Sequence, residues 1–251
     1  EVAIEPMLSC GTCKYCLGGE EPYCKESLPR TLGIGIDGGM AERVVVPERF
    51  LIPLDPRVSI ENAFLVEPLA VAVRSLGRVG IAKGDRVCVI GAGTIGLCCV
   101  AAAVHMGAIV ELESRHSHQL EAGIQLGAME LSEQPAQVVI EAAGTGSALS
   151  RAIEKCQRGG VVGIPSTYWE PVEIPALTMG MKEVSLVPSI TYGHTTGQRD
   201  FELAMSVLAN FPLLGSAVIT HRYPLDGASE AFEMARRRHN GVIKVAIDVS
   251  A

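Results

Sequence analysis

Four cysteines lie within fifteen residues near the start of the chain, in the stretch CGTCKYCLGGEEPYC. Four thiolates can surround one zinc ion as a tetrahedron, at sulfur–zinc distances of about 2.3 Å, when the backbone folds back on itself. The glycines between the cysteines permit such folding. The spacing C-x2-C-x2-C-x7-C favours a structural zinc site, because four protein ligands leave no open position for chemistry. The predicted ligands are Cys10, Cys13, Cys16 and Cys24.

Disulfide bonds and a redox-active C-x-x-C pair are the alternatives for these cysteines. Disulfide frameworks suit small secreted domains, whereas this chain of 251 residues resembles a cytosolic enzyme, so we expect a cytoplasmic protein. A redox pair would not explain four cysteines. The remaining thiols stand in apolar runs, where a buried cysteine acts as a small hydrophobic side chain. These are Cys88, Cys98, Cys99 and Cys156.

A glycine-rich turn in the stretch RVCVIGAGTIGLCCVAAAV is the second motif. A G-x-G-x-x-G sequence is weak evidence alone, but it indicates a dinucleotide-binding turn when it follows a strand and opens a helix. The first glycine allows a tight turn, the second lets the backbone approach a pyrophosphate, and the third lets helix and strand pack closely. A turn without a ligand is the alternative. The residues predicted to contact the coenzyme here are Gly91, Gly93, Thr94, Ile95 and Gly96.

Strands and helices then alternate along the chain, which predicts an α/β fold with a doubly wound parallel sheet. The predicted strands are 87–90, 108–112, 137–144 and 159–165, and the predicted helices between them are 117–126 and 147–156. Only nine residues separate the helix ending near Gly127 from the strand at Gln137. Six extended residues reach about 20 Å, and three strand spacings need about 14 Å. We therefore expect the third strand of the sheet to be short or missing.

Composition excludes several classes of partner. The formal charge of −7 argues against nucleic acid and anionic membranes, because both bind basic surfaces. An apolar content of 48% predicts a packed interior. One apolar stretch is long enough to raise the question of a membrane span, but its three glycines and the preceding KGDR fit a buried strand, turn and helix better.

In sequence order, these features resemble the zinc-containing medium-chain alcohol dehydrogenases, and most closely their polyol branch, the sorbitol and threonine dehydrogenases. The resemblance rests on the four-cysteine lobe, the glycine turn, DGGMAERVVVPERFLIPL, VEPLAVAVRSL, VVIEAAG and ITHRYPLDGASEAFEMA. It implies a Rossmann sheet joined to a partial, mainly β GroES-like catalytic domain that carries the structural zinc. The implied units are a partial catalytic domain (1–68), a coenzyme domain (69–193) and a C-terminal return to the catalytic domain (194–251).

The activity implied by the resemblance is zinc-dependent hydride transfer between a nicotinamide coenzyme and a secondary alcohol, a ketone or a polyol, in a homodimer or homotetramer. A zinc-independent NADPH quinone or enoyl reductase and a non-catalytic nucleotide-binding relative are the alternatives. Glu67, in the E-P-L-A motif, matches the family position that ligates or faces a catalytic zinc. No cysteine or histidine precedes Cys10, so we expect a partial chain that lacks the other ligands of that zinc. Tyr192 is a further predicted site residue, bordering the substrate.

Coenzyme preference depends on the residue that ends the second strand, about 20 residues beyond the glycine turn, where an acid favours NAD. Counting between the two Gly-Ala pairs places Ser114 there, followed by Arg115. A small hydroxyl leaves room for a 2′-phosphate, and a guanidinium pairs with it. A shift of one residue would instead place Glu113 at this position. We favour NADP(H) over NAD(H).

Overall fold

A parallel sheet of six strands, in the order β5-β4-β3-β6-β7-β8, is the framework of the computed structural model, which describes residues 1–195, 197–237 and 241–249. Every neighbouring pair in this sheet is parallel, which confirms the predicted doubly wound architecture. The strands are β3 (Arg86–Ile90), β4 (Ile109–Glu113), β5 (Met129–Glu130), β6 (Ala136–Glu141), β7 (Cys156–Ile164) and β8 (Ser185–Pro188).

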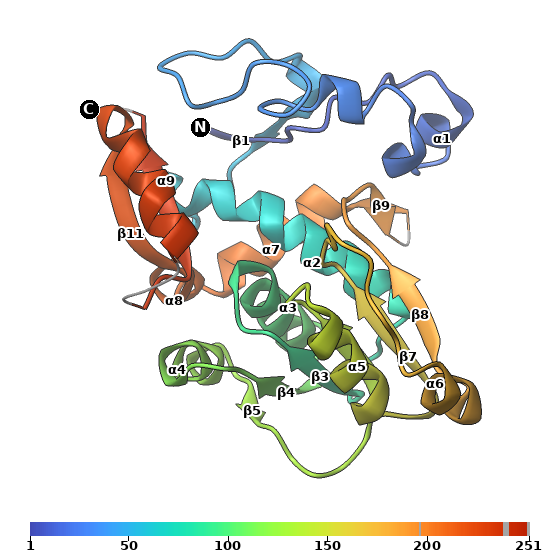
Figure 1. Cartoon of the computed structure of the whole chain (residues 1–251). Coiled ribbons are helices and arrows are strands. Elements are labelled where there is room, and N and C mark those ends of the chain that lie inside the picture. Colours follow the sequence, from blue (N-terminus) through green and yellow to red (C-terminus); the bar gives the residue numbers. More distant parts are fainter. Residues whose placement is uncertain (196, 238–240, 250–251) are drawn as a thin grey trace.

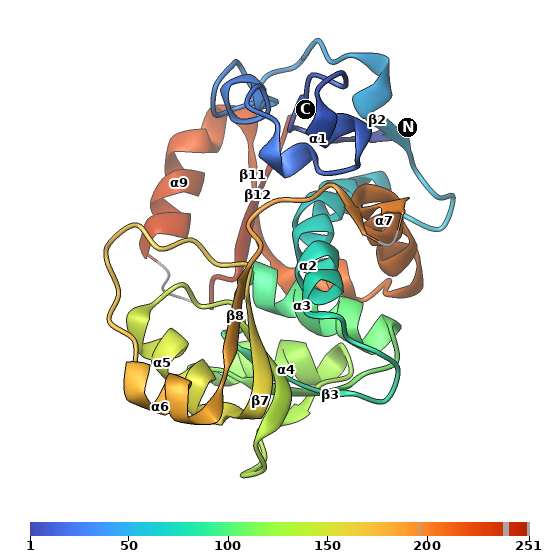
Figure 2. The same ribbon diagram turned by 90° about the vertical axis from the view of Figure 1, so that its right-hand side faces the viewer.

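Helices cover both faces of this sheet (Figures 1 and 2). Side chains alternate across β3, so Val87 and Val89 join the core beneath α3 while Cys88 and Ile90 join the core beneath α5. Burial on both faces explains why the strand reads as an unbroken apolar run. The helices are α2 (Val66–Val79), α3 (Thr94–His105), α4 (Ser117–Gln125), α5 (Gly146–Lys155), α6 (Ala176–Lys182) and α7 (Asp200–Asn210).

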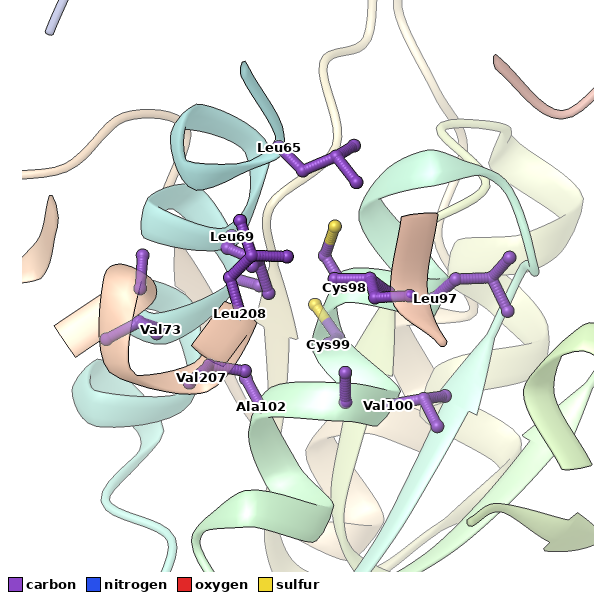
Figure 3. Close-up of a cluster of buried hydrophobic side chains, with 14 of the residues drawn as sticks. Leu65, Leu69, Val73, Leu97, Cys98, Cys99, Val100, Ala102, Val207 and Leu208 are labelled. Carbon is purple, nitrogen blue, oxygen red and sulfur yellow. The ribbon is translucent and has the colours of Figure 1, made fainter. Parts of the chain in front are cut away.

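Three of these helices, α2, α3 and α7, pack into one apolar cluster (Figure 3). Leu69 of α2, Cys98 of α3 and Leu208 of α7 are among its side chains, and the first two are completely buried. Burial raises the pKa of Cys98 to about 12, so the thiol stays neutral. Cys88, Cys99 and Cys156 are likewise completely buried, which confirms that these four cysteines are core residues.

The β5 edge of the sheet is trimmed, as the sequence predicts. β5 has two residues, and residues 131–135 reach β6 without a helix. The buried carboxylate of Glu111 fixes this connection: the Ser132 hydroxyl donates to it at 2.8 Å, Arg86 also donates to it, and Lys155 Nζ lies 3.7 Å away. Burial alone would raise the pKa of Glu111, but the hydrogen bonds from Ser132 and Arg86 outweigh it and lower the pKa.

The segment before α2 is less regular than the predicted mainly β unit. Its two strands, β1 (Val2–Ile4) and β2 (Leu51–Pro53), pair antiparallel. The apolar run at residues 44–46 is not a strand, and Val45 is 95% exposed. A strand needs a neighbouring strand to pair with, and no described strand lies beside this run. The remaining short elements here are α1 (Lys14–Leu17), η1 (Glu21–Tyr23), η2 (Leu28–Arg30), η3 (Glu48–Phe50) and η4 (Ile60–Leu65).

The C-terminal part returns towards the glycine turn. β11 (Ile219–Pro224) and β12 (Lys244–Asp248) pair in parallel, and α9 (Ala228–Arg237) connects them (Figure 1).

None of the described helices is long and apolar enough to cross a membrane. The predicted domain limits at residues 68 and 193 stay predictions. The other elements described in the C-terminal part of the chain are two strands and two short helices: β9 (His194–Thr195), β10 (Gln198–Arg199), α8 (Leu214–Val218) and η5 (Leu225–Gly227), with β9 paired antiparallel to β10.

Candidate coenzyme and metal sites

The glycine turn joins the C-terminal end of β3 to the N-terminus of α3, and two of its glycines are sterically required. Gly91 has φ +100°, and a Cβ there would lie 2.7 Å from the Ala143 backbone nitrogen. A Cβ on Gly96 would lie 1.8 Å from the Gly91 carbonyl oxygen, so helix and strand approach too closely for any other residue. Gly93 differs, because its Cβ would meet no atom within 4 Å. The open space at Gly93 is therefore available to a ligand.

A cleft of about 1340 Å³ opens at this turn. That volume exceeds the range of about 300–1,000 Å³ that encloses a drug-sized molecule, so the cleft has room for an extended ligand. The α3 N-terminus faces the cleft, and no side chain in the described part of the chain caps it. Uncapped N–H groups and the positive end of a helix dipole attract phosphate. Of the predicted coenzyme residues, six line the cleft: Gly91, Gly93, Thr94, Ile95, Ser114 and Arg115. Gly96 lies beneath them in the helix–strand contact.

Two segments that the sequence analysis missed also line the cleft. The first follows β6 and includes Ala143, Thr145 and Arg151, and the second includes Arg237 and Ile243 near β12. The first has a sequence signal, because the loop after the next parallel strand ends at the same edge of a sheet as the glycine turn. The second has none, because only the tertiary structure brings residues 149 positions apart together: the Thr94 hydroxyl donates to the Ile243 carbonyl at 3.4 Å.

A buried carboxylate holds the loop after β6 in place. Glu141 is fully buried, and its Oε1 accepts hydrogen bonds from the backbone nitrogens of Ala143 at 2.9 Å and Gly144 at 2.8 Å. Its Oε2 accepts hydrogen bonds from Ser166 and Tyr168 of the loop after β7. Since Ala143 lies against Gly91, Glu141 fixes one wall of the cleft relative to the glycine turn.

The end of β4 carries the residues expected to choose the coenzyme. Glu113 is the last strand residue, and Ser114 follows it. The Ser114 hydroxyl donates to the His116 carbonyl at 3.0 Å, and Arg115 is exposed. The Glu113 carboxylate lies 3.0 Å from Arg151 Nε of α5. Both possible positions for the discriminating residue, 113 and 114, therefore line the cleft, and the acid of the two is paired with a cation.

The four cysteines of the first lobe converge on one point. Their sulfur atoms all lie within 4.8 Å of one another, and all eight cysteines of the chain are unbridged. The N–H of Thr12, the hydroxyl of Thr12 and the N–H of Cys13 donate to Cys10 Sγ and lower the pKa of that thiol to about 6. Thiolates are the form that binds metal. The spacing of the cysteines, the convergence of their sulfur atoms and the lowered pKa of Cys10 fit one tetrahedral ion, whereas burial raises the pKa of Cys16 to about 12.

Glu67 and Tyr192 lie outside the cleft. Glu67 is half-buried in the first turn of α2; burial raises its pKa, and the nearby Lys244 opposes that shift. Tyr192 is 3% exposed and packs edge-to-face on Phe201. Burial, followed by the charges of Glu67 and Glu5, raises the pKa of Tyr192. Within the described residues, the four cysteines form the only group of three or more His, Cys, Asp or Glu side chains close enough to share an ion. Glu67 by itself does not supply a catalytic zinc site.

The chain is similar to known proteins over nearly its whole length. Residues 60–249 match the family model for the glucose dehydrogenase C-terminus, and residues 1–56 match the model for the alcohol dehydrogenase GroES-like domain. An uncharacterized zinc-type alcohol dehydrogenase-like protein of Haemophilus influenzae is 31% identical over 87% of this chain and 67% of its own length. A sorbitol dehydrogenase of Bacillus subtilis is 27% identical over 98% of this chain and 73% of its own length.

Two solved structures share the fold and more than a quarter of the sequence. L-idonate 5-dehydrogenase from Escherichia coli K-12 superimposes with a TM-score of 0.88 and 26% identity, over 99% of this chain and 75% of the other. A proposed zinc-binding dehydrogenase from Sinorhizobium meliloti bound to NADP superimposes with a TM-score of 0.84 and 26% identity, over 98% of this chain and 76% of the other. The chain thus belongs to the polyol dehydrogenase branch of the zinc-containing medium-chain alcohol dehydrogenases, a family of NAD(P)-dependent oxidoreductases.

Proposed function

We propose that this chain binds NADP(H) in the cleft at the glycine turn, holds one structural zinc ion in the four-cysteine lobe, and serves hydride transfer to or from a secondary alcohol, a ketone or a polyol. The uncapped α3 N-terminus facing a cleft of about 1340 Å³ carries this proposal. The sorbitol and idonate dehydrogenases among its relatives support the class of substrate.

The chain's own residues would bind and orient the coenzyme. The backbone N–H groups after Gly93 would donate to a pyrophosphate, because no described side chain caps them and no Cβ fills the approach. Gly91 and Gly96 hold strand and helix close enough to aim those groups into the cleft. Ala143, fixed by Glu141, would form the opposite wall. When bound, the nicotinamide supplies the hydride acceptor or donor.

Selection of NADP(H) would rest on Ser114 and Arg115. The Ser114 side chain is small enough to leave room for a 2′-phosphate, and the exposed Arg115 guanidinium can donate two parallel hydrogen bonds to it. The Sinorhizobium neighbour that binds NADP is a precedent for this coenzyme on this fold. We also predict a homodimer or homotetramer from the family likeness.

Glu67 and Tyr192 remain proposed site residues. The influence of Glu67 on the pKa of Tyr192 indicates that the two groups are neighbours, and Lys244 also lies close enough to affect Glu67. We propose that Glu67 faces the reacting end of the substrate and that Tyr192 supports it from the core. No step of this proposal passes through a catalytic zinc, because the described residues do not complete a site for one.

Nucleotide titration of the purified chain tests the central claim. The fluorescence of NADPH should change saturably on binding, and Gly93→Asp should weaken binding by at least tenfold, because a carboxylate would occupy the approach of the pyrophosphate and repel it. Gly39→Asp is the matched control: a Cβ there also meets no atom within 4 Å, and Gly39 does not line the cleft. Equal affinities for NADPH in the two variants would contradict the assignment of the cleft.

A further inference from the structure

Strand β4 and helix α5 are joined by two ion pairs that no local sequence pattern reveals. Glu111 and Glu113 are two residues apart, so both project from the same face of β4. Arg151 and Lys155 are four residues apart and share one face of α5. Arg151 Nε lies 3.0 Å from Glu113 Oε2, and Lys155 Nζ lies 3.7 Å from Glu111 Oε2. Because residues 131–135 form no helix, these cations reach β4 directly.

The two pairs have different surroundings. Glu111 and Lys155 are 5% and 4% exposed, and the connection at Ser132 shares their network. Glu113 and Arg151 are 30% and 44% exposed and both line the cleft. The Glu111 pair therefore holds the sheet edge, whereas the Glu113 pair is available to a ligand.

The position of Glu113 makes its charge important to a bound dinucleotide. Its carbonyl accepts the Gly91 N–H at 2.9 Å, which fixes the residue beside the glycine turn. A free carboxylate at this end of the second strand accepts hydrogen bonds from ribose hydroxyls and repels a 2′-phosphate. Arg151 already engages one oxygen of this carboxylate and offsets its charge.

We propose that Arg151 is a specificity-determining residue that withdraws the Glu113 carboxylate from the adenosine ribose and so favours a 2′-phosphorylated coenzyme. This inference rests on the proposed function. The other charges of the cleft agree with it: Arg115 forms no ion pair with a described acid, whereas Arg237 lies 2.6 Å from Glu233. Arg115 is thus the guanidinium left for the phosphate, and Arg151 acts by masking the competing acid.

Binding constants for NADH and NADPH, measured on the full chain, test this proposal without requiring turnover. The ratio Kd(NADH)/Kd(NADPH) should exceed one in the parent protein. Arg151→Ala should lower this ratio about tenfold, since it exposes a carboxylate that binds ribose hydroxyls and repels phosphate. Glu113→Gln leaves no charge to mask, so adding Arg151→Ala to it should change the ratio by less than about twofold. Arg57→Ala, which breaks a remote surface pair with Asp55, is the control and should leave the ratio unchanged.

Every other outcome would overturn either the role proposed for Arg151 or the proposed function as a whole. An unchanged ratio in Arg151→Ala would overturn the inference alone. A tenfold fall in both backgrounds would also overturn it, because Arg151 would then be a direct phosphate ligand. Weaker binding of both nucleotides by the same factor would assign Arg151 a structural role instead. Failure of the parent protein to bind either nucleotide would overturn the proposed function, and this inference with it.

Discussion

Single residues carry most of the chemistry of this molecule, and several of them are charged groups held away from water. Glu141 shows how such burial is tolerated, because four donors satisfy its two oxygens. At Glu5, by contrast, the cost of burying the charge outweighs the favourable contact with a cation. Its side chain is 6% exposed, and burial raises its pKa to about 7 although Arg199, 2.5 Å away, favours the charged form.

Glu5 therefore predicts a specific dependence of stability on pH. Because its pKa rises from 4.5 to about 7 on folding, its stabilising contribution is complete below pH 4.5 and is lost as pH rises through 7. Glu5→Gln should remove this loss, so its free energy of unfolding relative to the parent should increase by roughly 1–3 kcal/mol between pH 4.5 and pH 8. Urea unfolding at both pH values measures the difference, and a difference that stays constant or decreases would contradict the prediction.

At the scale of elements, the short connection between β5 and β6 is the main departure from a regularly alternating sheet. A buried carboxylate replaces a helix there: Glu111 of β4 binds Ser132 of the connection, Arg86 of β3 and Lys155 of α5. One residue thus ties two strands and a helix to the same connection. Such networks stabilise only when every member is satisfied.

Removing one donor from this network should measurably destabilise the sheet edge. Ser132→Ala deletes the hydroxyl that donates to Glu111 at 2.8 Å, and we expect a loss of about 1–3 kcal/mol in the free energy of unfolding. Ser229→Ala, at an exposed position in α9, should change it by less than about 0.5 kcal/mol. Chemical denaturation of both variants makes the comparison; equal stabilities would show that the network does not hold the edge.

At the scale of the whole molecule, the four-cysteine lobe docks onto α2, which lies between that lobe and the sheet (Figures 1 and 2). Arg74 of α2 is 4% exposed and lies 2.7 Å from Glu20 of the lobe and 3.7 Å from the fully buried Asp200 of α7. His194 Nδ1 lies 3.2 Å from Glu21. The lobe thus supplies carboxylate partners to Arg74 and His194 outside the lobe, so its order matters to the stability of the rest.

Loss of the metal should therefore destabilise the entire chain. Cys13→Ser should reduce the zinc content from one ion per chain to none and lower the unfolding temperature by about 5–10 °C, because zinc binding and folding of the lobe are coupled. Cys98→Ala, in the buried core, should keep the zinc. Metal analysis and thermal unfolding provide the readouts. A parent protein that carries no zinc when purified, and whose unfolding temperature does not rise when zinc is added, would refute this prediction.

Local sequence patterns are sufficient to predict much of the structure of this protein. The cysteine spacing, the glycine turn and the alternation of apolar strands with helices each depend on neighbouring residues, so the sequence alone predicts the parallel sheet, the convergence of four sulfurs and the short β5 edge. The ranges shift by one to three residues: β4 ends at Glu113 and not at Leu112, and β6 ends at Glu141 and not at Gly144. Hydrogen bonding decides such ends, and composition does not encode it.

Contacts between segments that are distant in the sequence could be identified only from the tertiary structure. The pairing of Arg151 with Glu113, the four donors around Glu141 and the approach of Ile243 to Thr94 join residues that no periodicity relates. Tyr192 illustrates the same limit, since only packing against Phe201 shows that it is a core residue. Periodic patterns specify which face of an element is buried, but the partner of each charge depends on how the elements stack, and that is set by the packing of the whole chain.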